Sequence, residues 1–198
     1  MPTLSSPLPD EFFMRDATLV ARELLGTELV TEVEGHVIRA VIVETEAYLG
    51  FDDPASHAYR GRRHAQNEGL YSPPGYWYVY RSYGIHWCAN LVTGIPAAGG
   101  AVLLRSVRIM DGMEGAVRRR GPVASAQLSN GPGKLCQALG IDRSLDGRLM
   151  RTSWARVYPA TTQVAEVEAT PRIGISRAVD WPLRFVVAPS PQRKRGGR

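Results

Sequence analysis

The alternation of hydrophobic and polar positions divides the first half of the chain into short elements. Residues 16–26 begin with aspartate, continue as an apolar periodic run and end in glycine, an order that predicts a capped helix. Two β-branched runs, residues 28–33 and 37–44, flank a short polar turn and predict a hairpin. Residues 49–75 show no usable periodicity and predict a long loop, which in a compact domain is usually functional or disordered.

The second half of the chain is predicted to contain several short strands with few helices between them. Strands are predicted at residues 76–81, 85–92, 101–107, 172–175 and 183–187, and short helices at residues 111–120 and 134–139. Strands that follow one another with few intervening helices favour an α+β fold with an antiparallel sheet. The length suits a single domain, spanning residues 1–198.

Both ends of the chain differ from the rest in composition. Residues 1–9 contain three prolines and predict a loose lead-in, and residues 189–198 predict a solvated basic tail. No run approaches the roughly 18 apolar residues of a membrane span, and no export signal opens the chain. Two cysteines, Cys88 and Cys136, are too few for a disulfide framework, so we expect a soluble, cytoplasmic protein with reduced thiols.

The charge adds a candidate partner. The formal net charge is +5, and 22 of the 24 basic side chains are arginine. Arginine binds phosphate through a bidentate fork and stacks on bases, so nucleic acid is a candidate. Codon usage in a GC-rich genome explains the same bias without any partner, and a charge of this size permits a polyanion but does not require one.

Two carboxylates end the second strand of the predicted hairpin. Glu44 and Glu46 have the same parity, so both point to one face of an extended chain. Carboxylates this close can divide into an acid and a base, and strand ends that open onto long loops often carry catalytic groups. The alternative is a charged strand end exposed to water.

Aromatic side chains concentrate around the next predicted hairpin. Tyr76, Tyr78 and Tyr80 share one strand face, and Tyr83 falls beside Gly84 at the turn. Tyrosines on a strand face are most often half-buried core, but beside many arginines they could form a stacking platform for bases. A bulky residue at a hairpin tip also suits insertion into a base stack.

The segment around Gly131, Gly133 and Lys134 is a glycine-rich turn that enters a helix. It lacks the first glycine and the final hydroxyl residue of a Walker loop. The helix start could still hold a phosphodiester through its free N–H groups, or be an ordinary start capped by Asn130. The histidines are scattered, and His86 with Cys88 is the only pair on one strand face, so we expect no metal site and no cofactor.

Taken together, these features resemble the alkyladenine (3-methyladenine) DNA glycosylases of the mammalian type, a family that also occurs in bacteria. The resemblance runs from Phe12 to Phe185, and its most specific motifs are residues 43–50, Tyr78-Val79-Tyr80 with Tyr83-Gly84, residues 102–105 and residues 131–139. It implies a single compact α+β domain with a curved antiparallel sheet, a protruding hairpin and flanking helices.

The resemblance also implies a role for each matching residue. Glu46 resembles the general base that activates water, and Arg105 an arginine near that water and the target phosphate. The base-binding residues would be Tyr48, His57 and Tyr80, which sandwich the flipped base, and Asn90 at its edge. Tyr83 would fill the gap in the duplex, while Gly131, Gly133 and Lys134 would meet the DNA backbone.

The implied activity is base-excision repair of double-stranded DNA. A monomer at the bacterial nucleoid would flip out alkylated or deaminated purines, 3-methyladenine first, with hypoxanthine and ethenoadenine as further candidates, and hydrolyse the N-glycosidic bond. Lys134 and Lys194 lie outside the pocket segments, so we expect a monofunctional enzyme without a Schiff-base step. Two rivals remain: a damaged-DNA-binding protein without catalysis, and a carbohydrate hydrolase that uses Glu44 with Glu46.

Overall fold

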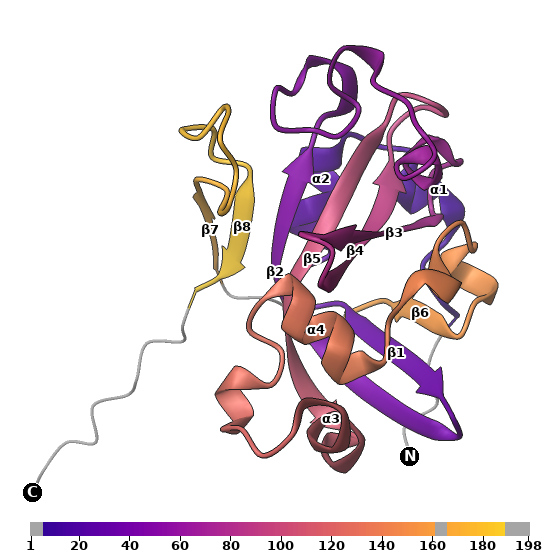
Figure 1. The fold of residues 1–198 in the computed structure, drawn as a ribbon, viewed down its shortest axis with the longest axis vertical. Coiled ribbons are helices and arrows are strands. Elements are labelled where there is room, and N and C mark those ends of the chain that lie inside the picture. Colours follow the sequence, from indigo (N-terminus) through magenta and orange to yellow (C-terminus); the bar gives the residue numbers. More distant parts are fainter. Residues whose placement is uncertain (1–5, 161–165, 189–198) are drawn as a thin grey trace, which may run out of the picture.

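The centre of the protein is one curved, eight-stranded sheet (Figure 1). The computed structural model describes residues 6–160 and 166–188. The strands are β1 Glu28–Val33, β2 His36–Tyr48, β3 Trp77–Ser82, β4 His86–Thr93, β5 Gly100–Asp111, β6 Ala155–Tyr158, β7 Val167–Thr170 and β8 Arg184–Val187. They follow the order β3-β4-β5-β2-β1-β6, with β8 pairing to both β2 and β7. Every strand pairing within the described residues is antiparallel, which confirms the predicted fold class.

Four α-helices and several short 3-10 turns surround the sheet. The helices are α1 Asp10–Phe13, α2 Ala17–Glu23, α3 Met113–Arg120 and α4 Pro132–Leu139. The 3-10 turns are Gly50–Asp52, Tyr59–Gly61, Glu68–Tyr71, Ser125–Gln127, Arg143–Leu145 and Met150–Thr152. The predicted cap of α2 is present, because the Asp16 side chain accepts a hydrogen bond of 2.8 Å from the amide of Thr18.

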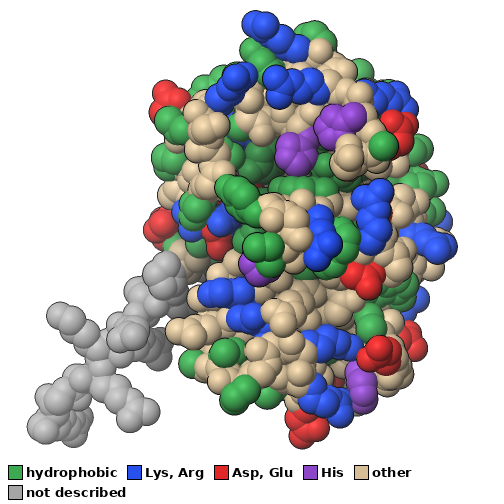
Figure 2. Space-filling model, viewed as in Figure 1, with side chains coloured by type: hydrophobic (Ala, Val, Ile, Leu, Met, Phe, Trp, Pro, Cys, Tyr) green, Lys and Arg blue, Asp and Glu red, His purple; other side chains and the backbone are tan. Residues whose placement is uncertain are grey.

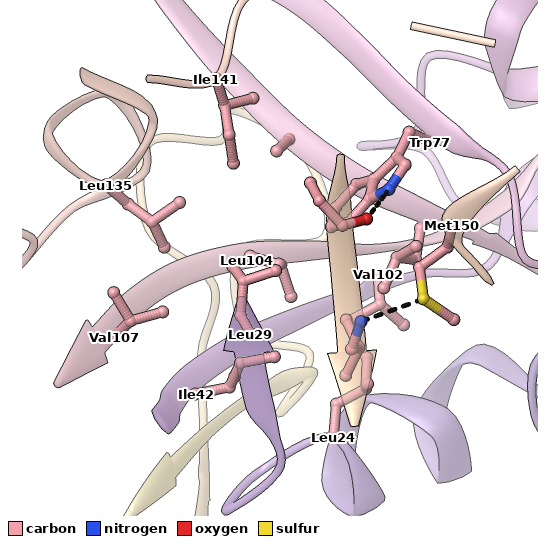
Figure 3. Packing of buried hydrophobic residues seen from close by; sticks show 14 of the residues in the cluster. Leu24, Leu29, Ile42, Trp77, Val102, Leu104, Val107, Leu135, Ile141 and Met150 are labelled. Carbon is pink, nitrogen blue, oxygen red and sulfur yellow. Dashed lines mark hydrogen bonds between the residues drawn. The ribbon is translucent and has the colours of Figure 1, made fainter. Parts of the chain in front are cut away.

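The hydrophobic core joins the strands to the helices. Leu29, Ile42 and Leu104 come from three neighbouring strands and belong to the same buried cluster as Leu135 of α4 (Figure 3). Trp77 is fully buried, and its indole Nε1 donates to the carbonyl of Ala155 at 3.1 Å, so the largest core side chain leaves no polar atom unsatisfied.

Strand β2 is the most enclosed strand of the sheet. Its residues 39–48 pair with β5 along one edge. Along the other edge, residues 36–41 pair with β1 and residues 44–46 with β8. Thr45 points away from its neighbours at 44 and 46, and its hydroxyl donates to the carbonyl of Ala21 in α2 at 2.8 Å. Glu44 and Glu46 therefore lie on a strand that is paired with other strands along both edges and is bonded to α2 on its opposite face.

One predicted strand is wrong. Residues 172–175 form no strand, because the Arg172 side chain enters a buried ion pair and the amide of Ile173 donates to a carboxylate instead of to a neighbouring strand. The sequence pattern did not indicate β7, which pairs with β8, and it missed α1 and β6 as well.

The ends of the chain are described only in part. The lead-in is anchored rather than loose from residue 8 onward, since Leu8 is buried and its amide donates to the carbonyl of Val157 at 2.8 Å. Residues 1–5 and the predicted basic tail, residues 189–198, lie outside the described residues. Within the described ranges, no helix combines the length and the apolar character needed to cross a membrane.

Candidate active site

A cleft of about 1150 Å³ opens where the end of β2 meets the β3–β4 hairpin. The loop after β2 and the connection between β7 and β8 lie at the same end of the sheet and form its walls (Figure 1). The cleft brings together six of the predicted site residues: Tyr48, His57, Tyr80, Tyr83, Asn90 and Arg105. Basic side chains also line it, and Lys and Arg dominate the charged groups on the face shown in Figure 2.

Glu46 lies fully buried beside this cleft, with both carboxylate oxygens engaged. The amide of Ile173 donates to Oε1 at 2.8 Å. Oε2 accepts a hydrogen bond of 2.9 Å from the Tyr48 hydroxyl and lies 3.2 Å from Nη1 of Arg105. The side chain has no exposed surface, so the alternative of a strand end in water is wrong for Glu46. These donors fix the orientation of a buried carboxylate and offset its desolvation.

Arg105 of β5 bridges the two carboxylates of β2. Its Nε donates to Oε1 of Glu44 at 3.0 Å, while Nη1 faces Glu46. Arg184 of β8 donates to the same Glu44 oxygen at 2.6 Å. Burial alone lowers the pKa of Arg105, but the charges of Glu46 and Glu44 outweigh this effect and raise the pKa overall. Glu44 therefore acts as an anchor for two arginines, and it does not form an acid–base pair with Glu46.

Aromatic rings form one side of the cleft. His57 and Tyr80 meet edge to face with centroids 4.5 Å apart, and Tyr78 stacks on Tyr80 at 5.4 Å. Nδ1 of His57 and the hydroxyl of the buried Tyr78 share a hydrogen bond of 2.8 Å, which orients the imidazole. Asn90, opposite Tyr78 in the β3–β4 register, donates to the Tyr78 carbonyl at 3.1 Å.

Burial controls the protonation of these rings. It lowers the pKa of His57, with a smaller contribution from the nearby His64, and thereby favours the neutral imidazole. Burial also raises the pKa of Tyr80, and burial together with the charge of Glu46 raises that of Tyr48. Both phenols therefore stay protonated around neutral pH and can donate hydrogen bonds.

Tyr83 lies at the tip of the β3–β4 hairpin, where the sequence predicted the turn. Its φ is 50° and that of Gly84 is 69°, and the amide of Ile85 donates to the carbonyl of Ser82 at 3.0 Å. Two consecutive positive φ angles are typical of a type I′ turn. The Tyr83 side chain is 88% exposed, so the hairpin holds a large ring in solvent at the edge of the cleft.

The glycine-rich segment reaches the cleft through the start of α4. Gly131 is the residue before the helix, and no side chain caps it, so the predicted cap by Asn130 is wrong. The Asn130 amide oxygen instead accepts from Nζ of Lys134 at 3.0 Å. A Cβ on Gly133 would lie 2.8 Å from the Cβ of His86, so glycine is needed for the helix start to approach the hairpin.

Sequence reasoning missed the groups that support this site. Asp53, Arg172, Ile173 and Arg184 all contact the end of β2 or the residues that bind it. The one local signal was a charged residue, Arg172, at the start of an otherwise apolar predicted strand. Among residues 6–160 and 166–188, no group of three or more His, Cys, Asp or Glu side chains is placed to hold a metal ion.

A buried, oriented carboxylate beside an aromatic cleft on a basic face is typical of a hydrolase that acts on a nucleic-acid base. Comparison with known proteins agrees. Residues 11–191 match the model of the family Methylpurine-DNA glycosylase (MPG). A protein of Granulibacter bethesdensis named "Putative 3-methyladenine DNA glycosylase" is 46% identical over 96% of this chain and 88% of its own length. A protein of the same name from Agrobacterium fabrum is 45% identical over 92% of this chain and 90% of its own length.

The chain belongs to the methylpurine-DNA glycosylase family. It is a DNA glycosylase, a hydrolase of N-glycosyl bonds with DNA as its substrate. The family resemblance found in the sequence is thereby confirmed.

Proposed function

We propose that this enzyme removes alkylated or deaminated purines from double-stranded DNA by hydrolysis with a water activated by Glu46. The expected substrate is 3-methyladenine, with hypoxanthine and ethenoadenine as further candidates. The observation that carries the proposal is the fully buried Glu46 carboxylate, which Arg105, Tyr48 and the amide of Ile173 hold beside an aromatic cleft.

The target base has to leave the helical stack before it can react. Tyr48, His57 and Tyr80 offer faces and edges of π-systems to the flipped base, which favours an electron-poor or cationic ring. Asn90 would lie against the base edge, and the exposed ring of Tyr83 would fill the space that the base leaves in the duplex.

Backbone contacts would come from the start of α4. Gly131 precedes the eight-residue helix α4, and Gly133 and Lys134 lie in its first turn, whose first residue, Pro132, lines the cleft. Free N–H groups at a helix start favour a phosphate, and the exposed Lys134 adds a positive charge. We infer that the enzyme works as a monomer in the cytoplasm, at the nucleoid of a bacterium.

The reaction follows from the charges around Glu46. Bond breaking between the base nitrogen and C1′ leaves positive charge on the sugar, which an ionised carboxylate stabilises. The water oxygen bonds to C1′, its proton passes to Glu46, and the electron pair of the broken bond stays with the base. A cationic methylated base leaves as a neutral molecule, whereas neutral hypoxanthine also needs a proton or hydrogen bonds to leave.

No lysine of the described residues 6–160 and 166–188 lines the cleft, so these residues offer no amine nucleophile for a lyase step. Lys134 lies on α4, binds Asn130 and is not among the residues that line the cleft. Monofunctional hydrolysis therefore leaves an abasic site with an intact backbone. A protein–DNA adduct that borohydride traps with the wild-type chain would contradict it.

Single-turnover release of base tests the proposal. Duplexes that carry 3-methyladenine or hypoxanthine are mixed with excess wild-type protein, with Glu46→Gln, and with Glu28→Gln. Glu28 is a matched control, since it is also a buried, ion-paired carboxylate but pairs with Arg39 on the opposite half of β2. We expect release by the wild type and by Glu28→Gln, and binding without release by Glu46→Gln. Binding without release by the wild type would favour the damaged-DNA-binding alternative.

A further inference from the structure

The ring of Tyr48 is covered on one face by a cation. The guanidinium carbon of Arg172 lies 4.7 Å from the ring centroid. The Arg172 side chain is fully buried and is absent from the residues that line the cleft, whereas Tyr48 lines it. Arg172 therefore occupies the face of the ring that is turned away from the cleft, and the opposite face is the one available to a base.

Asp53 holds this cation in place. Its carboxylate binds both terminal nitrogens of Arg172, with Nη2 to Oδ1 at 2.8 Å, and Nη1 also donates to the carbonyl of Ala47 at 3.0 Å. The Asp53 oxygens accept two further hydrogen bonds, from the amides of Leu49 and Ala55 at 3.1 and 3.0 Å. Both side chains of the ion pair are fully buried, so solvent screens the guanidinium weakly.

A cation on one face of an aromatic ring changes what the other face can bind. The negative potential of the π-face attracts cations, and a guanidinium already bound to that π-system reduces the attraction left for a second cation. It also repels the second cation directly. A neutral base is bound by dispersion and stacking and is affected much less.

We propose that Arg172 is a specificity-determining residue, which acts through the Tyr48 ring to weaken the binding of positively charged bases relative to neutral ones. This inference rests on the proposed function, because it requires that the flipped base stacks on Tyr48. Asp53 contributes to the same effect, since its carboxylate partly neutralises the guanidinium of Arg172 and so sets how much positive charge the Tyr48 ring experiences.

Two substitutions of the same ion pair distinguish this role from a structural one. Arg172→Gln removes the cation and leaves the carboxylate, whereas Asp53→Asn leaves the cation and removes the carboxylate. The measured quantity is the ratio of single-turnover release rates for cationic 3-methyladenine and neutral hypoxanthine, at subsaturating enzyme. We expect the ratio to rise roughly threefold in Arg172→Gln and to fall by a similar factor in Asp53→Asn. The change should come from the half-saturating enzyme concentration rather than from the maximal rate.

If the Arg172–Asp53 ion pair only supports the fold around Glu46, a different result is expected. Both substitutions break the same bonds and loosen Ile173 beside Glu46, so both would slow release of the two bases together and leave the ratio unchanged. That outcome overturns the proposal. If Arg172→Gln does not fold, the double variant Asp53→Asn/Arg172→Gln replaces it, since it also lacks the cation and contains no unpaired charge. Its ratio should also lie above that of the wild type.

The same data separate this inference from the proposed function. If the wild type releases neither base, the proposed substrates are wrong. If the wild type releases both bases and no variant shifts the ratio, only the role of Arg172 is wrong.

Discussion

The hydroxyl of Tyr48 donates a hydrogen bond of 2.9 Å to Oε2 of Glu46, two residues earlier on the same strand. Residues two apart in a strand share a face, so the strand itself brings the Tyr48 ring, which lines the cleft, into contact with the carboxylate. Burial and the negative charge of Glu46 raise the pKa of Tyr48, which keeps the phenol in its donor form. The ring that would bind the base thus also orients the carboxylate.

Replacing this hydroxyl should slow the reaction without preventing binding. Tyr48→Phe keeps the ring and removes one donor to a buried carboxylate, a hydrogen bond to a charged group worth about 1.5–3 kcal/mol. We expect single-turnover release to slow by roughly tenfold or more, with nearly unchanged affinity for damaged duplex. Tyr158→Phe on β6 is the control, because this ring lies away from the cleft. Equal rates in Tyr48→Phe and the wild type would contradict the orienting role.

Folding stability should depend on pH through His57. Burial lowers the pKa of this imidazole below the 6.5 of an exposed histidine. Between the two values the unfolded chain binds more protons than the folded one, so stability is full above 6.5 and decreases as the pH falls toward the folded value.

Urea unfolding at about pH 7 and about pH 5 measures this effect. The wild type should lose more free energy of unfolding on acidification than His57→Gln does. His36→Gln serves as the control for the loss of one histidine side chain, since His36 contacts Arg118 of α3 far from the cleft. An undiminished loss in His57→Gln would show that another group carries the pH dependence.

Tyr83 should matter for DNA and not for folding. Tyr83→Gly removes the exposed ring and places glycine at a φ of 50°, where a bulky residue is strained. We expect the free energy of unfolding to stay within about 1 kcal/mol of the wild type. Release from duplex DNA should slow roughly tenfold, because a ring that stacks between bases contributes about 1–3 kcal/mol. Tyr83→Phe should retain most of the rate, and an equal loss in both variants would argue against stacking.

Gly133 should tolerate no side chain while His86 is present. In Gly133→Ala the added methyl would lie 2.8 Å from the Cβ of His86 and 3.0 Å from its Cγ. Moving α4 or the hairpin to relieve this overlap should cost about 1–3 kcal/mol of stability and weaken DNA binding. The double variant Gly133→Ala/His86→Gly removes the overlap at Cβ and should recover part of the loss in a thermal melt. Independent effects of the two substitutions would place the defect elsewhere.

Short sequence patterns correctly predicted those parts of the fold that are determined by residues adjacent in the chain. The cap of α2, the β1–β2 hairpin and the turn at Tyr83 each follow from a few adjacent residues, and all three are present. The same logic failed at residues 172–175, where apolar character indicated a strand. There, the amide of Ile173 donates a hydrogen bond to Glu46, and the side chain of Arg172 forms an ion pair with Asp53.

The support of the site depends on pairs that are distant in sequence. Asp53 and Arg172 are 119 residues apart, and Glu44 and Arg184 are 140 residues apart. Neither spacing leaves a periodic signal, and several acidic residues could have served as partners of each arginine. The parity of Glu44 and Glu46 correctly predicted one shared face, but it did not indicate that Arg105 and Arg184 make Glu44 an anchor.

Because β2 is enclosed by other strands, the backbone position of Glu46 and the shape of the cleft can change independently of one another. Glu46 lies on a strand that has paired neighbours along both edges, so the backbone amide protons of β2 should exchange with deuterium only when much of the sheet opens. The cleft is lined by strand residues such as Tyr80 and Asn90, and also by the loop after β2 and the connection between β7 and β8, which accept substitution and changes of length more readily than strands. Sequence changes in those loops can therefore reshape part of the cleft, while the strand that carries the buried Glu46 carboxylate stays unchanged.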